Sequence, residues 1–555
     1  MQKKCANIFA NIAQPGKKQF WREMALLILL MLLCGGEGLL LGQDVNWDLL
    51  NYHLYNPYAL LTGRFYTDLM PAGIHTFFNP LLDVPVYLAV KYLNNFPKLV
   101  TFLFSSTAGI FIFFVYKTAL LFFPQKEDRL LGLFATAIGC SGGMFVSQIG
   151  LSTHEVTVSI LLAGACYLIF QFITRTQSSL KKIALAGVLL GAAVGLKYTA
   201  APVALGLVCG LVVQWKKFMA PTRVLGILVG SALVGFLVTN GYFITRLWVM
   251  YQNPVFPFFN GIFHSPYFMA ENWTDTRFFP TTWTQWIFFP SSWLVNWFHA
   301  PAEVPFADPR LWLGEICFFV LLAALLYRRG QLVAQKPLVG SLLVMVAVSY
   351  VSWLWVYSIL RYIILLEALS GILMVLAIRH WCSREVALVA CTLLAIGTWG
   401  LTTFPEWGRS GFTKQLIHFY SFPKIPSNSM VVFYGNPLSF LAPFFPKDTT
   451  FVGGLKYPPA EMYPKELQQD AKKRNALPGV YYEHRLTSQI KQKIAAFEGP
   501  VYVVGVAGAV LSDPISLTPY GMRAIPGSCN TFSAELTFSL KRWEICEVEK
   551  IATSF

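Results

Sequence analysis

Acidic, histidine and tyrosine side chains are concentrated in residues 44–85, directly after the first apolar run of the chain. Apolar residues such as Leu50 and Leu54 recur there with a helical period, which predicts an amphipathic helix lying on a membrane surface. Asp44 and Asp48 are four residues apart and would share one face of that helix. A carboxylate at a boundary between water and lipid is the right chemical type for a general base that acts on an amphiphilic substrate. Asp48 is the candidate base, and the alternative is that these acids only solvate the helix.

Charged residues also stand at the ends of several later apolar runs. Ionisable groups at membrane depth are costly to bury, so we treat them as candidate functional residues. The ends of spans on the outer side of a membrane are usually poor in lysine and arginine. Lys197, Arg246 and Arg361 are expected at such ends and need a reason to lie there, and a bound phosphate would supply one. The structural alternatives are cations that snorkel to the interface and acids that cap helices or, like the deeper Glu367, balance a buried positive partner. Four further substrate-binding candidates stand at the ends of these runs: His154, Glu155, Tyr198 and Tyr362.

The composition is that of a membrane protein. Of 555 residues, 55% are hydrophobic and only 13% are charged, which is too apolar for a soluble globular protein. The net charge of +15 comes largely from short basic clusters between apolar runs, as in topology determinants, and no basic stripe interleaved with stacking aromatic residues is present. Nucleic acid is therefore not expected as a partner. A donor made from a soluble nucleotide sugar is not supported either, because the sequence lacks a P-loop motif and a dinucleotide-binding glycine motif.

The apolar runs and the basic clusters between them predict a polytopic α-helical protein with about eleven transmembrane helices. The basic leader, residues 1–23, would be cytoplasmic and the first span a retained anchor, because no clear cleavage site follows it. With all basic clusters on the cytoplasmic side, the transmembrane domain 24–403 has outer loops at 43–97 and 244–310, and residues 404–555 lie in the periplasm. This predicts a multi-pass protein of a bacterial inner membrane. The expected spans are 24–42, 98–122, 130–147, 155–174, 183–200, 202–215, 224–243, 311–327, 337–356, 361–379 and 386–403.

The second outer loop is rich in aromatic residues. This composition suits a segment that rests in the interfacial belt of the membrane, and the alternative is a mobile cover over a groove for a lipid substrate. After the run at 253–263, the loop contains Trp273, Trp283, Trp286, Trp293 and Trp297.

The last part of the chain differs in composition from the apolar region. Short β-like runs within residues 425–550, with one helix-like stretch near 488–497, predict a small mixed α/β domain outside the membrane. Cys529 and Cys546 fall in it and could form a disulfide in an oxidising periplasm. The other cysteines lie mostly in apolar runs without metal-binding spacing, so a structural zinc site is not expected.

The arrangement of these features along the chain resembles that of the GT-C superfamily. Its members are integral-membrane glycosyltransferases that use polyprenyl-phosphate-linked sugars. The sequence looks similar to the branch that holds lipid A aminoarabinose transferases and protein O-mannosyltransferases. In that branch an Asp-Glu pair is followed by a tyrosine, an alanine-rich turn, a glycine and later a Lys-Pro-Pro-Leu element. The residues at similar spacing here are Asp48, Tyr52, Ala59, Gly63 and Asn79-Pro80-Leu81, and His154-Glu155 and Arg361-Tyr362 also look similar to the family.

Two positions depart from the family pattern. Leu49 replaces the second acid, which puts a metal role or a paired-acid mechanism in doubt. Asn79 replaces the lysine, which puts a contact to the donor phosphate there in doubt.

The resemblance implies an inverting glycosyltransferase that moves a sugar from a polyprenyl-phosphate carrier to a cell-envelope acceptor on the periplasmic side. Asp48 would be the general base, and Lys197, Arg246 or Arg361 would hold the leaving phosphate. The acceptor could be a glycolipid, a polysaccharide or a protein. No cofactor is implied, and the need for a divalent cation stays open. The substrate-binding candidates in the first outer loop are Asp44, Tyr52, His53, Arg64 and Asn79.

Two other functions compete with this one. A transporter or flippase for a lipid-linked or anionic solute would account for charges at membrane depth, but it predicts polar groups near the bilayer midplane and an internal repeat. A non-catalytic scaffold for envelope assembly would leave Asp48 without a task.

Overall fold

The computed structural model divides the chain into two compact units. Unit 1 consists of Met1–Leu41, Thr101–Gly241 and Thr276–Trp407, and unit 2 of Gly42–Val100, Tyr242–Asp275 and Gly408–Phe555. Trp273, Trp293 and Trp297 lie outside the described residues. The structure describes residues 17–174, 179–272, 274–275, 277–291, 294, 304–327, 332–455, 485–508, 517–536 and 540–551.

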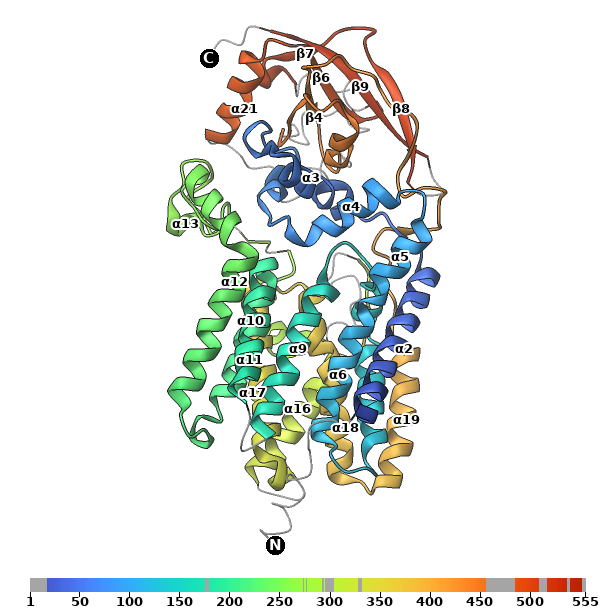
Figure 1. Cartoon of the computed structure of the whole chain (residues 1–555), viewed down its shortest axis with the longest axis vertical. Coiled ribbons are helices and arrows are strands. Elements are labelled where there is room, and N and C mark those ends of the chain that lie inside the picture. The colour runs from blue at the N-terminus through green and yellow to red at the C-terminus, as the bar shows by residue number, and fades with distance from the viewer. Residues whose placement is uncertain are drawn as a thin grey trace. The chain divides into compact units, whose positions relative to one another are not determined.

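Unit 1 is a bundle of apolar helices (Figure 1). Each of the eleven apolar runs predicted from the sequence overlaps one helix or two successive helices, and one of them, 155–174, has the bounds of α9. The helices that overlap these runs are α2 (Lys17–Leu41), α5 (Pro97–Ser106), α6 (Ala108–Phe122), α7 (Arg129–Cys140), α8 (Gly143–Ser147), α9 (Glu155–Thr174), α10 (Leu180–Leu196), α11 (Ala201–Val212), α12 (Pro221–Tyr251), α16 (Arg310–Leu326), α17 (Leu332–Val356), α18 (Ile364–Trp381) and α19 (Arg384–Gly400).

The length and hydropathy of these helices confirm a polytopic helical membrane protein. Six apolar stretches in the described part of the chain are long enough to cross a bilayer. The number of spans stays a prediction. The six stretches are Lys17–Leu41, Pro97–Phe122, Glu155–Thr174, Pro221–Tyr251, Lys336–Val356 and Leu360–Trp381.

Helix α18 is the central helix of unit 1. Its residues from Ile364 to Ala377 are all buried. A side chain at Gly139 of α7 would collide with the backbone of Ala368, and one at Gly371 of α18 would collide with the backbone of Ala135. Small residues thus let α7 and α18 approach closely, as is usual where helices pack in a membrane.

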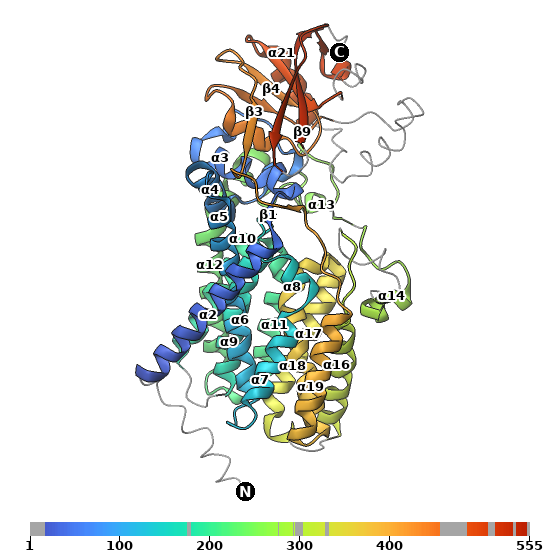
Figure 2. The same cartoon turned by 90° about the vertical axis from the view of Figure 1, so that its right-hand side faces the viewer.

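Unit 2 contains a mixed sheet, as the composition of the last part of the chain predicts. Its strand order is β3-β8-β9-β6-β4-β5, with β7 also paired to β9; β5, β4 and β6 are parallel and the other pairs are antiparallel. Helix α21 (Arg485–Ala496) lies beside the sheet (Figure 2). Its Leu486, Ile490 and Ile494 belong to the same hydrophobic core as buried strand residues. The strands are β3 (His418–Ser421), β4 (Met430–Phe433), β5 (Thr450–Val452), β6 (Val501–Val506), β7 (Met522–Ala524), β8 (Asn530–Glu535) and β9 (Leu540–Lys550).

The terminal domain also contains the disulfide that the sequence left open, between Cys529 and Cys546. Cys546 lies in β9 opposite Val503 of β6, in the buried middle of the sheet. The other cysteines in the described part of the chain are free.

The first outer loop is part of the core of unit 2. Met70, Ile74 and Phe77 pack with buried residues of the terminal sheet and α21. Leu69 extends the sheet, because its N–H donates to Phe451 O (2.9 Å) and its carbonyl accepts from Gly453 N (3.0 Å).

The predicted amphipathic surface helix in this loop is therefore wrong. The segment forms a π-helical turn, η1 (Leu49–His53), followed by helix α3 (Tyr55–Thr62), and residues 49–59 are buried without interruption. The apolar residues do recur with a helical period, but the polar residues between them are buried as well. The terminal domain supplies part of the cover: its short helix η10 (Ser439–Phe444) begins at Ser439, whose hydroxyl donates to the carbonyl of Asn51.

The second outer loop is shared between the two units. Its first part belongs to unit 2, where the fully buried side chain of Asn260, in α13 (Asn260–Phe263), binds the backbone of Ser265, Phe268 and Met269. Its second part contains α14 (Trp283–Phe288), in which Trp283 and Trp286 are exposed. Exposed tryptophans suit a membrane interface. Interfacial anchoring and a mobile cover both stay predictions for this part.

Candidate active site

Asp48 stands at the start of the π-helical turn η1 in unit 2, where it is half-buried. Single π-helical turns are rare and often occur at functional sites. The preceding Asn46 fixes the entry to this turn, because its side-chain oxygen accepts the N–H of Leu49 (2.8 Å). The candidate base is thus held on an ordered turn, with part of its side chain accessible.

Asp44 does not share a helix face with Asp48, contrary to the prediction. It lies in β1 (Gln43–Asp44), which pairs antiparallel with β2 (Arg409–Ser410). One of its carboxylate oxygens accepts from the backbone N–H of Asn46 (3.0 Å) and from its side chain (2.7 Å). Asp44 therefore orders the residues that lead to Asp48.

Tyr52, also on η1, belongs to a cluster of rings. It stacks on His75 at 5.0 Å between centroids and meets Phe78 edge-on at 5.4 Å. His75 in turn meets Trp47 edge-on at 5.4 Å. The sequence makes Tyr52 a substrate-binding candidate but does not single out Trp47 or Phe78, because only the fold brings residues 47, 52 and 75–78 together.

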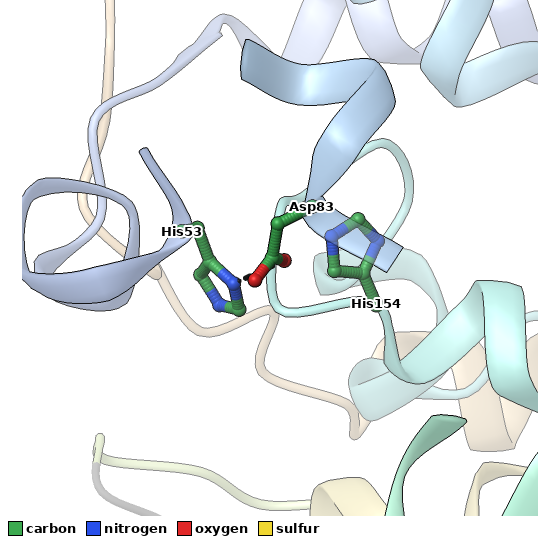
Figure 3. A group of neighbouring side chains, drawn as sticks. All are labelled: His53, Asp83 and His154. Atoms are coloured by element: carbon green, nitrogen blue, oxygen red, sulfur yellow. Dashed lines mark hydrogen bonds and ion pairs between the residues drawn. The ribbon is translucent and has the colours of Figure 1, made fainter. Parts of the chain in front are cut away.

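His53 pairs with Asp83 in the interior of unit 2 (Figure 3). Its Nδ1 lies 2.5 Å from Asp83 Oδ1, and both side chains are buried. A carboxylate on one imidazole nitrogen fixes the orientation and tautomer of the ring, as in many proton-transfer and metal sites. Asn79 helps to position Asp83. Its side-chain oxygen accepts from Leu81 N (3.1 Å), at the start of the turn η4 (Leu81–Asp83) that carries Asp83.

Arg64 makes structural contacts in the core of unit 2, and its role in substrate binding stays a prediction. Its guanidinium makes a two-point ion pair with Asp68, at 2.8 and 3.0 Å, and donates to the carbonyls of Lys447 and Thr449. Burial alone would lower the pKa of Arg64, but the paired Asp68 raises it, so the arginine stays charged. With four of its N–H groups engaged inside the core, it has little left to offer a ligand.

Arg246, near the end of α12, has the opposite character. Its guanidinium lies over the ring of Phe65, 3.2 Å from the centroid. Within the described part of the chain, its buried Nε and Nη1 atoms have no hydrogen-bond partner. A half-buried cation with open donors is suited to an anionic ligand.

The predicted residues of unit 1 converge on Glu155, at the start of α9. Lys197 Nζ lies 2.5 Å from Glu155 Oε1 and donates to the carbonyl of Thr153 (2.7 Å). Arg361 Nη1 lies 3.7 Å from the same carboxylate oxygen. Two cations therefore share one buried carboxylate.

Aromatic side chains surround these two cations. The ring of Tyr362 lies 5.6 Å from Lys197 Nζ and 5.3 Å from Arg361 Cζ, and Trp407 lies 5.5 Å from Arg361 Cζ. Aromatic faces stabilise a cation without neutralising its charge.

Tyr198 and His154 hold the ends of the helices in this region. The hydroxyl of Tyr198 accepts from Asn240 Nδ2 (2.9 Å), and its carbonyl accepts from the hydroxyl of Tyr357 (3.3 Å). His154 has a left-handed backbone with φ of 62°, and its carbonyl accepts from Val158 N (2.9 Å), at the start of α9. Left-handed backbone is uncommon for histidine and is tolerated where the surroundings enforce it.

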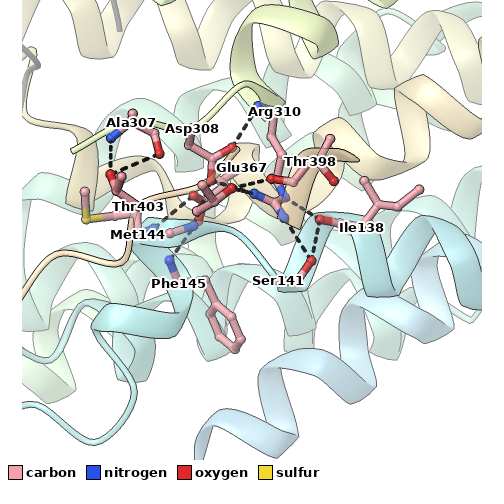
Figure 4. Close-up of polar contacts among 12 residues, drawn as sticks. Ile138, Ser141, Met144, Phe145, Ala307, Asp308, Arg310, Glu367, Thr398 and Thr403 are labelled. Atoms are coloured by element: carbon pink, nitrogen blue, oxygen red, sulfur yellow. Dashed lines mark hydrogen bonds and ion pairs between the residues drawn. The ribbon is translucent and has the colours of Figure 1, made fainter. Parts of the chain in front are cut away.

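A second polar network in unit 1 surrounds Glu367 (Figure 4). Glu367 accepts from the backbone N–H groups of Met144 (3.1 Å) and Phe145 (2.8 Å), at the start of α8. Asp308 accepts from the N–H of Gly143 (2.7 Å), and Arg310, which is fully buried, donates to Asp308 (2.7 Å).

This network gives the buried carboxylate of Glu367 a structural role. The sequence allowed for a buried positive partner but did not identify Arg310, which lies at the end of the second outer loop. Arg310 also donates to the carbonyl of Ile138 (2.7 Å) and to the hydroxyl of Thr402 (2.6 Å). The network fixes α8, whose last residue, Ser147, accepts from the indole of Trp407 (3.1 Å).

No family model and no curated protein sequence matches the chain. Among solved structures, it is similar to the crystal structure of ArnT from Cupriavidus metallidurans bound to undecaprenyl phosphate, with a TM-score of 0.49 and 13% identity. That comparison covers 95% of this chain and 97% of the ArnT chain. The apo structure of the same ArnT gives a TM-score of 0.48 and 13% identity, with the same coverage. The similarity thus runs along nearly the whole length of both chains.

Proposed function

We propose that this protein is a membrane glycosyltransferase that moves a sugar from a polyprenyl-phosphate carrier to a cell-envelope acceptor, with inversion at the anomeric carbon. The observation that carries the proposal is the pair of cations, Lys197 and Arg361, on the single carboxylate of Glu155. A simple structural ion pair would need only one cation. An anionic group that binds here would accept charge-assisted hydrogen bonds from both cations.

A polyprenyl phosphate meets these requirements. Its phosphate is the leaving group, on which negative charge develops as the bond to the sugar breaks, and positioned cations stabilise that charge. Its lipid chain suits a protein whose helices are long and apolar enough to cross a bilayer. Arg246, with open donors over Phe65, is a second candidate for the phosphate.

Asp48 is the proposed general base. It would take the proton from the acceptor hydroxyl while the oxygen of that hydroxyl bonds to the anomeric carbon and the bond from this carbon to the phosphate oxygen breaks. A positioned base of this kind contributes roughly 10²–10⁴-fold in rate. Tyr52 and His53, next to Asp48 on the same turn, would line the sugar pocket.

The phosphate site is tested by the binding of undecaprenyl phosphate to the purified protein in detergent. We expect the double variant Lys197→Gln/Arg361→Gln to weaken binding by about 100-fold, because it removes both charge-assisted contacts. Glu155→Gln removes the counter-charge and should retain binding. Lys216→Gln, an exposed lysine of η6 (Trp215–Lys217), is the control for loss of one positive charge.

These variants separate a ligand site from a structural ion pair. If the two cations only stabilise Glu155, the double variant will lower the melting temperature and leave the affinity of the folded protein unchanged. Equal affinity in the wild type and the double variant, measured on folded protein, would overturn the proposal.

A further inference from the structure

Four partly exposed rings form a row in unit 2 that begins at Trp47, the residue before Asp48. This aromatic row consists of Trp47, His75, Phe78 and Phe258. Successive ring centroids are 5.4, 5.1 and 5.9 Å apart. Trp47 is 39% exposed, and the other three rings are half-buried. An aromatic row that belonged only to the core would be covered along its whole length.

Buried polar side chains hold the row in place from behind. Asn51 Nδ2 lies 3.2 Å from His75 Nδ1, so an amide proton faces this ring nitrogen. Asn56, which is fully buried, donates to the carbonyls of His75 (2.9 Å) and Phe78 (3.4 Å). Tyr52 stacks on His75. The rings are therefore pre-organised, which lowers the entropic cost of binding a ligand.

The row combines the faces of its rings with polar residues at its edges. Trp47 is adjacent in sequence to Asp48, and the half-buried Asn79 directly follows Phe78. Pockets with aromatic walls and a few fixed polar groups are typical of small-molecule sites. A sugar ring has this same composition, because its C–H face packs on an aromatic ring while its hydroxyl groups bond at the edges.

We propose that the aromatic row binds the saccharide ring that carries the acceptor hydroxyl. This inference rests on the proposed transfer and assigns its acceptor to the class of envelope glycans. The hydroxyl that reacts must reach the carboxylate of Asp48, and Trp47 directly precedes Asp48, so a saccharide ring that bears this hydroxyl is within reach of the indole. A hydroxyl on a protein acceptor would bring a peptide backbone there instead. A polyprenyl chain would leave the polar edges of the row without hydrogen bonds.

Steady-state transfer with two separately varied substrates tests this assignment. The donor is a radiolabelled polyprenyl-phosphate sugar, and the acceptor is the delipidated polysaccharide fraction from the envelope of the source organism. We expect Trp47→Ala to raise the apparent KM for the polysaccharide at least about tenfold, since truncated aromatic anchors often cost this much. The KM for the donor and the melting temperature should stay unchanged. Trp47→Phe keeps a ring face and should retain most of the acceptor affinity.

Tyr420→Ala is the matched control. It removes an exposed ring from β3, elsewhere in unit 2, and should alter neither KM. An unchanged acceptor KM in Trp47→Ala would overturn the role of the row. Label that enters protein instead of polysaccharide in the wild type would overturn the glycan assignment while leaving the proposed function intact. A wild type that transfers label to no envelope fraction refutes the proposed function, and the inference fails with it.

Discussion

Two arginines of unit 2 show how burial and hydrogen bonding decide what a charged residue does. Arg64 and Arg246 are both partly enclosed by aromatic rings. Arg64 donates four N–H groups to Asp68 and to backbone carbonyls. Arg246, in contrast, has donor atoms without a hydrogen-bond partner among the described residues. The first arrangement stabilises the fold, and the second is available to a ligand. The type of residue alone does not separate the two.

Arg64→Gln should lower the stability of the protein strongly. It leaves the buried carboxylate of Asp68 without its ion-pair partner, and breaking a buried pair typically costs about 3–5 kcal/mol. The free energy of unfolding, or the melting temperature in detergent, measures the loss. Arg523→Gln is the control, because Arg523 and Glu549 form an exposed pair, with side chains 62% and 45% exposed. Exposed pairs contribute about 0–1 kcal/mol. Equal melting temperatures for the two variants would contradict the structural role of Arg64.

At the scale of elements, α8 connects the buried acids of unit 1 to its cationic group. Glu367 and Asp308 accept the first N–H groups of this short helix. Its last residue, Ser147, accepts from Trp407, whose ring lies near Arg361. The position of Arg361 therefore depends on a helix that contains none of the charged residues.

Gly142→Ala tests how tightly Glu367 packs at the start of α8. A methyl group at Gly142 would collide with the carboxyl group of Glu367, which is held in place by its hydrogen bonds. We expect a loss of about 1–3 kcal/mol in stability, the usual cost of overpacking. Gly36→Ala is the matched control, since a methyl group at Gly36 meets no atom within 4 Å. A thermal-shift assay compares the two variants, and a Gly142→Ala variant as stable as the control would show that Glu367 can move aside.

The helical elements could be predicted from the sequence to a large extent. Apolar runs between basic clusters overlap the helices of unit 1, because the requirement for about 20 apolar residues per span is a strong local constraint. The π-helical turn before α3 could not be predicted in this way. Its residues are covered by the terminal domain, which follows almost 400 residues later in the chain. The helical period of the apolar residues therefore predicts an exposed polar face where the fold buries it. Arg310 was missed for a similar reason, since its partners come from distant helices.

At the scale of the whole molecule, unit 2 is assembled from three separate stretches of chain. Its core joins the first outer loop, the end of α12 and the terminal sheet. The sequence predicted these stretches as outer loops and a terminal domain. It could not predict that they form one core, because the contacts between them carry no periodic signal.

The disulfide between Cys529 and Cys546 tests the side of the membrane on which unit 2 lies. Disulfides persist in the periplasm and are rare in the cytosol. We expect thiol labelling of denatured protein, taken from cells without reductant, to find both cysteines blocked. Closing a loop over a separation of 17 residues contributes about 3 kcal/mol, so Cys546→Ala should also lower the melting temperature. Free thiols at both positions in freshly isolated membranes would contradict the predicted periplasmic location.

Asp48 is the proposed base of the transfer reaction. The most direct measurement is the transfer of radiolabelled sugar from a polyprenyl-phosphate carrier to the envelope fraction, in membranes that contain the wild type or Asp48→Asn at matched expression. We expect the rate to fall by roughly 10²–10⁴-fold in Asp48→Asn, with unchanged binding of undecaprenyl phosphate. Glu549→Gln, which neutralises an exposed carboxylate of the terminal domain, should transfer at the wild-type rate. Transfer by Asp48→Asn at the wild-type rate would contradict the account. Movement of the intact lipid-linked sugar between leaflets, without transfer, would favour a transporter instead.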